Sequence, residues 1–325
     1  MTTPAMNPSR PTSAELAGAA RRPEAAEGSA RQSRPAAGQG RSAAAFLAPF
    51  LVLYVLFIVG PALYGLVMSF FDTSMVKAGL STFAGVQNYV DALSSADFWS
   101  SLGHTFWFTI LTTPPLVVLA LVLALLANRV RRGRWFYRLA FFMPYVLPSA
   151  VVALIWMWIL APGIGLLDTS LAKIGITAPN WLGSESWAMP ALALTTVWWT
   201  LGFNFVLYLA GLQEIPRDLY EAAELDGATP WQQIRHITIP LLGRTTTLVA
   251  VLQLIASLKV FDQMYIMTSG GPNFATRSLL EYVYDESFTN YRVGYASAVS
   301  MLFFVVVLLV SVVWFRMVRS QQKEV

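Results

Sequence analysis

Six long apolar stretches constrain this chain more than any other feature of its sequence. Each is close to or above the roughly 20 residues that an α-helix needs to cross a bilayer. We expect six transmembrane helices over residues 44–71, 105–127, 137–160, 188–212, 241–267 and 295–317. The sequence therefore predicts an all-α, polytopic membrane protein.

Composition supports this class and excludes several kinds of site. Of the 325 residues, 56% are hydrophobic and 12% are charged, whereas soluble domains carry about 25% charged residues. The absence of cysteine excludes disulfides, thiolate metal sites and cysteine nucleophiles. Neither His104 nor His236 stands in an HExxH-like spacing. We expect neither a metal site nor a catalytic histidine.

The chain divides into three parts by composition. Residues 1–42 contain mostly Ala, Ser, Gly, Pro and Arg, so they cannot bury enough surface to offset the entropy cost of ordering, and we expect a disordered tail. Because no aromatic residues lie between its arginines, this tail is interpreted as lying near anionic membrane lipid rather than binding nucleic acid. Residues 43–318 are expected to form the membrane domain, and residues 319–325 a short C-terminal tail.

Positive charge is distributed unevenly between the two sides of the predicted membrane. One side would hold both tails and the second and fourth loops, and its cations are Arg10, Arg21, Arg22, Arg31, Arg34, Arg41, Arg129, Arg131, Arg132, Arg134, Arg138, Arg217, Arg235, Arg244, Arg316, Arg319 and Lys323. The other side holds only Lys77, Lys173, Arg277 and Arg292. Because cytoplasmic loops carry an excess of Lys and Arg, we expect both termini to be cytoplasmic.

Residues 213–240, between the fourth and fifth apolar stretches, carry a pattern typical of two short helices joined by a sharp bend. Pro216 stands where a first helical position would. Gly227 is suited to end the first helix, because it adopts the left-handed conformation without a Cβ clash. Thr229, Pro230 and Gln232 have the pattern of an N-cap, a first helical position and a capping-box partner.

The stretch EAAELDGATPWQQIRHITIP within this loop resembles the EAA loop of binding-protein-dependent ABC importers. The positions that fall in register are Glu221, Ala222, Ala223, Gly227, Ile237 and Pro240. Ile239 stands where the family usually has Leu, which keeps the position apolar. The resemblance implies a cytoplasmic coupling helix that docks into a cleft of an ATPase. Glu221 would contact the ATPase, the small residues would permit close approach, and Asp226 would stabilise the bend.

Further stretches extend the resemblance to the carbohydrate-type branch of these permeases. They are FAGVQNY at 83–89, FFMPYVLP at 141–148, AGLQEIP at 210–216, YIMTSGGP at 265–272 and GYASA at 294–298. The resemblance implies a prokaryotic cell-membrane importer of a sugar, an oligosaccharide or glycerol 3-phosphate. The implied partners are a second homologous permease, two cytoplasmic ATPase subunits and an extracytoplasmic solute-binding protein.

The sequence contains no GxxxxGK[ST] phosphate-binding loop. We therefore expect a transport subunit rather than an enzyme, with no cofactor bound by this chain and with ATP and Mg on the partner ATPases.

Polar residues inside the apolar stretches are candidates for a cargo path, because such residues are costly in a membrane. Lys259 and Asp262 are three residues apart, so we expect them on one helix face, where they can pair and point into a cavity. Gln253 and Ser257 share a neighbouring face, and Asn204 and Phe205 stand in the fourth stretch. The alternative role of these side chains is hydrogen bonding and packing between helices.

Two other functions remain open at this point. An ion-coupled secondary transporter would need several buried carboxylates, and Asp262 is nearly the only one in the apolar stretches. A membrane-embedded enzyme would need a clustered acid, base or metal site. The dense acidic cluster here is that of Glu221, Glu224 and Asp226 in the EAA loop. A permease subunit that moves cargo by alternating access accounts for more of the sequence than either.

Overall fold

The structure is a computed structural model that describes residues 37–74, 79–130 and 133–321. Of the tail predicted over residues 1–42, residues 1–36 lie outside this part, and residues 37–42 begin a helix that continues into the first apolar stretch. The last helix extends to Gln321 and so includes the start of the predicted C-terminal tail. The orientation charges outside the described residues are Arg10, Arg21, Arg22, Arg31, Arg34, Lys77, Arg131, Arg132 and Lys323.

The chain divides into two compact units, Met1–Val59 and Gly60–Val325. The described part of the first unit consists of α1 (Ala37–Tyr54) and a π-helical turn, η1 (Val55–Val59). Helix α2 (Gly60–Met68) opens the second unit and follows η1 directly in sequence. Residues Phe46–Met68 are long and apolar enough to cross a membrane.

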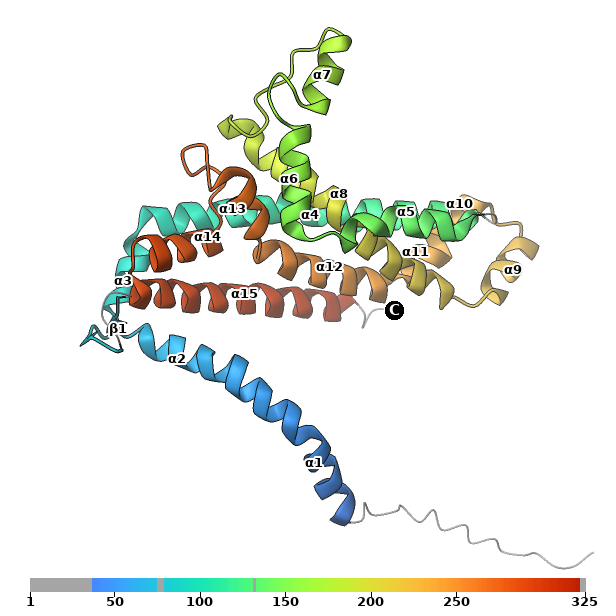
Figure 1. The fold of residues 1–325 in the computed structure, drawn as a ribbon. Coiled ribbons are helices and arrows are strands. Elements are labelled where there is room, and N and C mark those ends of the chain that lie inside the picture. Colours follow the sequence, from blue (N-terminus) through green and yellow to red (C-terminus); the bar gives the residue numbers. More distant parts are fainter. Residues whose placement is uncertain (1–36, 75–78, 131–132, 322–325) are drawn as a thin grey trace, which may run out of the picture. The chain divides into compact units, whose positions relative to one another are not determined.

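The remainder of the second unit is almost entirely helical (Figure 1). Strands β1 (Phe71–Asp72) and β2 (Thr82–Phe83) form one antiparallel pair. The long helices are α4 (Ala96–Arg129), α8 (Glu185–Gln213), α12 (Gly243–Leu258) and α15 (Val293–Gln321). The shorter elements are α3 (Gln87–Ser94), α5 (Arg134–Val146), α6 (Ser149–Ile159), α7 (Leu166–Lys173), α9 (Asp218–Leu225), α10 (Pro230–Gln233), η2 (Ile234–Thr238), α11 (Ile239–Leu241), α13 (Asp262–Thr268), α14 (Leu279–Tyr284) and η3 (Asp285–Thr289).

The core of this unit forms where α4 packs against both α8 and α12. Ala120 and Ala124 of α4 are fully buried beside Phe205 and Tyr208 of α8. Small residues at such contacts let helix backbones approach closely, which drives association in lipid, where there is no hydrophobic gain between helices. The contact of α5 with α8 follows the same rule, because a Cβ on Gly202 would overlap the backbone of α5 at Phe141.

The third predicted span is bent, and a second bend lies at the start of the fifth. Residues Trp135–Val146 and Ser149–Ile159 meet at 97°, and Pro230–Leu241 meets Gly243–Leu258 at 61°. The first bend has a clear cause, since Leu147 precedes Pro148 and adopts the extended conformation that a following proline imposes. Within the described residues, four helices are long and apolar enough to cross a membrane, and the number reaches six if each bent pair is one span.

The fifth predicted span, residues 241–267, is not one continuous helix. Helix α12 ends at Leu258, and α13 begins at Asp262 after an irregular break at residues 259–261. The expectation that Lys259 and Asp262 share one helix face and pair is therefore wrong. The carboxylate of Asp262 instead accepts a hydrogen bond from Ser149 Oγ at 2.8 Å.

We predict that Gly202→Ala weakens the packing of α5 on α8. The added Cβ would overlap a backbone carbonyl, which cannot move aside as a side chain can. Overpacking of this kind costs roughly 1–3 kcal/mol, so thermal unfolding of the purified protein in detergent should shift to lower temperature.

The matched control is Gly103→Ala in α4, where a Cβ would meet no atom within 4 Å. It should leave unfolding unchanged or raise its midpoint slightly, because alanine favours a helix over glycine. Equal shifts for the two variants would contradict the assigned contact.

Candidate functional site

The EAA segment, residues 213–240, contains the two short helices that its sequence predicts. Helix α9 begins at Asp218 with Arg217 as its N-cap, so Pro216 precedes the helix instead of taking the predicted first position. Asp218 and Glu221 lie in its first turn. Acidic side chains at this position interact favourably with the positive end of the helix dipole. Glu221 and Ala222 are exposed to solvent, and Ala223 is half-buried.

Gly227 ends α9 in the manner expected. Its φ of 79° is left-handed, its N–H bonds to the carbonyl of Glu224, and the N–H of Ala228 bonds to the carbonyl of Ala223. This pair of bonds is the Schellman arrangement, which satisfies carbonyls at the helix end. Asp226 is the C-cap residue and donates its N–H to Ala222 O at 3.1 Å. The bend is therefore fixed by backbone hydrogen bonds.

A capping box starts the second helix as predicted. Thr229 Oγ1 accepts from Gln232 N, Gln232 Oε1 accepts from Thr229 N at 2.7 Å, and Pro230 occupies the first helical turn. A hydroxyl–hydroxyl hydrogen bond of 2.9 Å between Tyr220 and Thr238 then ties α9 to η2. The two helices are thus held in one arrangement.

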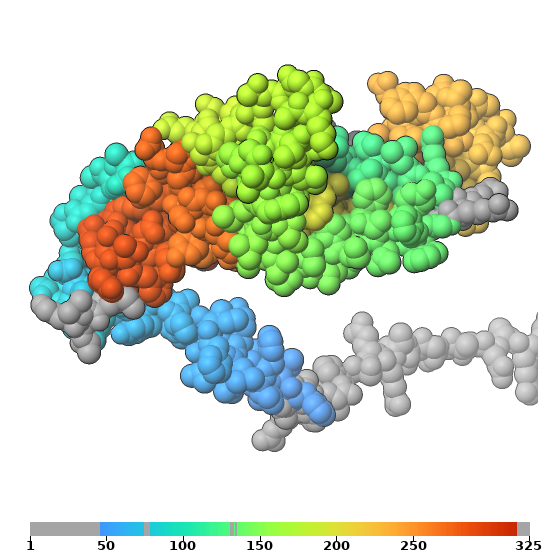
Figure 2. Space-filling model, turned by 45° about the horizontal axis from the view of Figure 1, so that its top comes forward, coloured from blue at the N-terminus to red at the C-terminus, as the bar shows by residue number. Residues whose placement is uncertain are grey.

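The EAA segment presents apolar and small residues to its surroundings. Leu225 is 90% exposed and Trp231 is 67% exposed. Beside them lies a hollow of about 340 Å³ whose lining includes Ala223, Asp226 and Gly227. The segment forms a lobe at one end of the face seen in Figure 2. An exposed apolar anchor beside a small-residue hollow is suited to contact with another protein.

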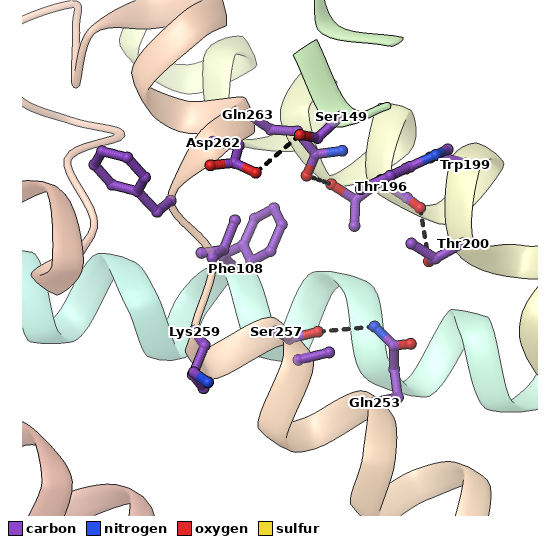
Figure 3. A pocket seen from close by; sticks show the side chains of 13 residues that line it. Phe108, Ser149, Thr196, Trp199, Thr200, Gln253, Ser257, Lys259, Asp262 and Gln263 are labelled. Carbon is purple, nitrogen blue, oxygen red and sulfur yellow. Dashed lines mark hydrogen bonds between the residues drawn. The ribbon is translucent and has the colours of Figure 1, made fainter. Parts of the chain in front are cut away.

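A second candidate site lies between the break at residues 147–148 and the break at residues 259–261. A cavity of about 190 Å³ is lined by α4, α6, α8, α12, the 259–261 break and α13 (Figure 3). Its lining residues are Phe108, Ser149, Thr196, Trp199, Thr200, Gln253, Ala256, Ser257, Lys259, Val260, Phe261, Asp262 and Gln263. The lining thus combines aromatic rings, hydroxyls, amides, one cation and one anion.

Hydrogen bonds hold most of these polar groups in place. Ser257 Oγ accepts from Gln253 Nε2 at 3.1 Å and lies 2.9 Å from Thr112 Oγ1 of α4. Thr196 of α8 donates to Gln263 Oε1 at 2.8 Å. Gln263 is only 4% exposed, and its Nε2 has no hydrogen-bond partner among the described residues. Since a buried unpaired donor is costly, this N–H group has an unmet hydrogen-bonding requirement beside the cavity.

The structure places the predicted cargo-path residues in two groups. Gln253, Ser257, Lys259 and Asp262 line the cavity. Asn204 and Phe205 are completely buried in the helix core and do not line it. Asn204 Nδ2 donates to Gln253 Oε1 at 3.1 Å, so it supports a cavity residue without lining the cavity itself.

Several cavity residues were not singled out from the sequence. Ser149 reaches the cavity because Pro148 bends the chain, and Gln263 reaches it because α13 starts a new helix. Thr196 and Thr200 stand four apart on α8, a spacing that places them on one face. That spacing was the one local signal that could have identified them.

A buried polar cluster fixes the loop that follows α13. Arg277 pairs with Asp97 at 2.8 Å, donates to Ser101 Oγ at 3.3 Å and lies over the ring of Phe274. Burial, together with the negative charge of Asp285, raises the pKa of Glu281 to about 7. The loop is thereby anchored to α4, and the start of α14 is held in place.

We predict that Ser257→Ala destabilises the protein by roughly 1–2 kcal/mol, because it leaves the Gln253 amide and the Thr113 hydroxyl without their acceptor. The measurement is thermal unfolding in detergent. Ser300→Ala is the control, since that hydroxyl donates only to Ala296 O of its own helix. If the two variants unfold alike, the cavity network contributes no stability.

Known proteins similar to this chain were found by sequence and by structure. A family model described as "Binding-protein-dependent transport system inner membrane component" matches residues 116–322. A sulfoquinovosyl glycerol transport system permease protein of Agrobacterium fabrum is 34% identical over 279 residues, which cover 86% of this chain and 91% of the relative.

Two more relatives and one solved structure agree with this match. A trehalose/maltose transport system permease protein of Thermococcus litoralis is 34% identical and covers 85% of this chain and 93% of its own length. The sn-glycerol-3-phosphate transport system permease protein of Agrobacterium fabrum is 34% identical, with 85% and 94% covered. The structure is that of a bacterial alginate ABC transporter in complex with an alginate pentasaccharide-bound periplasmic protein. One of its chains matches with a TM-score of 0.78 and 25% identity, covering 88% of this chain and 96% of that one.

Proposed function

The chain belongs to the family of binding-protein-dependent transport system inner membrane components, and from this premise we propose that it carries a neutral sugar or oligosaccharide. As a member of that family it is a multi-pass permease subunit of an ABC importer. The observation that carries the proposal is the polar cavity at the two helix breaks.

The chemistry of the cavity supports a neutral polyhydroxyl cargo. Hydroxyls of Ser149 and Thr196 and amides of Gln253 and Gln263 suit sugar hydroxyls, and the half-buried rings of Trp199 and Phe261 suit the apolar face of a sugar. Lys259 and Asp262 contribute one charge of each sign to the lining. A phosphate-bearing cargo such as sn-glycerol 3-phosphate would meet the carboxylate as well as the ammonium group, so we favour a neutral sugar.

The EAA segment is proposed to be the contact with the ATPase. Its exposed Glu221 is suited to a polar contact, Ala222, Ala223 and Gly227 leave room for a close approach, and Leu225 offers an apolar anchor. Asp226 is the C-cap residue of the first helix and contributes one of the backbone hydrogen bonds that hold the bend. Pro240 lies in α11, next to the 61° bend into α12. Movement of the segment would therefore be passed to α12.

The remaining partners follow from the same proposal. Two cytoplasmic ATPases would bind ATP and Mg and supply the energy, and a second permease would complete the pathway. A solute-binding protein would deliver cargo on the outer side, a role supported by the periplasmic protein bound to the alginate transporter. Both termini and the EAA segment would then face the cytoplasm, consistent with the distribution of Lys and Arg.

The test is uptake by cells that carry the complete importer. Labelled trehalose, maltotriose, arabinotriose and sn-glycerol 3-phosphate are offered separately, with and without depletion of ATP. ATP-dependent uptake of a neutral sugar is the expected result. Uptake that follows an ion gradient instead would favour a secondary transporter and contradict the proposal.

We predict that Glu221→Lys and Gly227→Val each abolish uptake while membrane insertion stays intact. The first reverses a charge on the docking surface. The second forces a β-branched residue into a left-handed conformation, at a cost of about 1–2 kcal/mol. Uptake and co-purification of the ATPase are measured together.

Asp91→Lys, a charge reversal at another exposed position, on α3, is the control and should transport normally. Full transport by either of the first two variants would remove the coupling role.

We predict that Asp262→Ala lowers transport by about tenfold or more, as expected for the loss of a charged hydrogen-bonding partner, without weakening ATPase assembly. Asp262→Asn keeps an acceptor for Ser149 and isolates the contribution of the charge. The measurement is KM and Vmax of uptake. Unchanged kinetics in Asp262→Ala would show that the carboxylate serves packing alone.

A further inference from the structure

Four aromatic rings lead away from the cavity toward the end of the second unit opposite the EAA segment. We call Phe261, Tyr265, Tyr284 and Phe288 the aromatic row. Phe261 lines the cavity and stacks on Tyr265, with centroids 5.3 Å apart and planes at 15°. Tyr284 lies 5.5 Å from Phe261 and 5.0 Å from Tyr265, and Phe288 lies 5.0 Å from Tyr284. The rings form one continuous group.

The position of the aromatic row follows from the break in the fifth span. Phe261 is the N-cap residue of α13, Tyr265 lies one turn further, and Tyr284 and Phe288 come from α14 and η3. Figure 1 shows α13 and α14 close together, far from α9 and α10 along the unit. Under the proposed orientation this end is the outer end, from which cargo enters.

The aromatic row remains accessible although its members contact one another. Phe288 is 53% exposed and Tyr265 is 37% exposed. None of the four rings belongs to the hydrophobic core clusters of the described residues. The hydroxyls of Tyr265 and Tyr284 lie 3.5 Å apart, so the surface combines ring faces with polar groups at their edges. Aromatic residues of this amphipathic kind are suited to ligands that are apolar on one face and polar at the rim.

Two carboxylates and one ammonium group lie near the row. Asp285 directly follows Tyr284 and Asp262 directly follows Phe261, whereas Lys259 stands two residues before Phe261 and lines the cavity with it. Arg277 is paired with Asp97 and packed on Phe274 and Tyr282, so its charge is already matched. The carboxylates near the row would repel an anionic ligand, but they do not repel a neutral sugar that contacts the ring faces.

We infer that the aromatic row is a second sugar-binding surface, which holds the outer residues of a neutral oligosaccharide whose inner end occupies the cavity. The inference rests on the proposed function, because it assumes that the cargo is a sugar. It adds a dependence on cargo length. Loss of the row should weaken binding of a cargo long enough to reach from the cavity to Phe288, and should have little effect on a shorter one.

The test compares Phe288→Ala with Tyr291→Ala in cells that carry the complete importer. Tyr291 lies in the same loop and is 50% exposed, close to the exposure of Phe288, but it is not part of the row. Uptake of trehalose, maltotriose, arabinotriose and sn-glycerol 3-phosphate by the wild type is measured first. KM and Vmax are then measured for the longest and the shortest sugar carried.

We expect Phe288→Ala to raise KM for the longer sugar about threefold to tenfold, the range expected for loss of one aromatic contact. Vmax and the KM for the shorter sugar should stay unchanged, Phe288→Trp should restore the wild-type KM, and Tyr291→Ala should have no effect. Equal amounts of each variant in the membrane show that folding is preserved.

Three results would overturn the inference. Unchanged KM for a sugar that the wild type carries refutes the aromatic row alone. A fall in Vmax with raised ATP hydrolysis in the absence of cargo shows that the row seals against the second permease instead. A wild type that carries sn-glycerol 3-phosphate and none of the neutral sugars overturns the proposed function and the inference together.

Discussion

A bilayer interior offers no water to the backbone, so every N–H and C=O inside it needs a partner from the protein. That requirement explains why the second unit is built from helices and why irregular backbone is confined to a few places. Two of these, residues 147–148 and 259–261, border the same cavity. Non-helical backbone at membrane depth is tolerated where it lines a polar or water-filled space. The breaks and the cavity therefore depend on one another.

The same constraint places the polar side chains of the cavity. Ser149 begins α6 after one break, and Asp262 begins α13 after the other. A carboxylate in the first turn of a helix is stabilised by the exposed N–H groups and the dipole there. The bond from Ser149 to Asp262 joins the two helix starts at 2.8 Å. The two interrupted segments are thus tied to each other by one side-chain hydrogen bond.

Local signals in the sequence were sufficient for the EAA segment. Gly227 and the Thr229–Gln232 capping box act within a few residues of themselves, so their conformation could be predicted without tertiary contacts. The fifth span was different. Residues 259–261 contain neither Pro nor Gly, and nothing local indicates that α12 ends at Leu258. The expected pairing of Lys259 with Asp262 failed for that reason.

Burial also could not be predicted from local sequence. Asn204 and Gln253 are both amides in apolar stretches, and no local signal distinguishes them. In the structure Gln253 lines the cavity, whereas Asn204 is wholly buried behind it and donates to it at 3.1 Å. Periodicity defines a face of a helix, but it does not state what that face meets.

Helix α12 connects the two candidate sites mechanically. One end meets the EAA segment at the 61° bend, and the other carries Gln253 and Ser257 and ends at the break beside the cavity. Its 16 residues span about 24 Å at 1.5 Å per residue. Packed helices behave as rigid elements, so small shifts at one end are carried to the other. A tilt imposed at the bend would displace Ser257 relative to Thr112 of α4, to which it is bound. Under the proposed coupling role, movement of the EAA segment would therefore reach the cavity through α12.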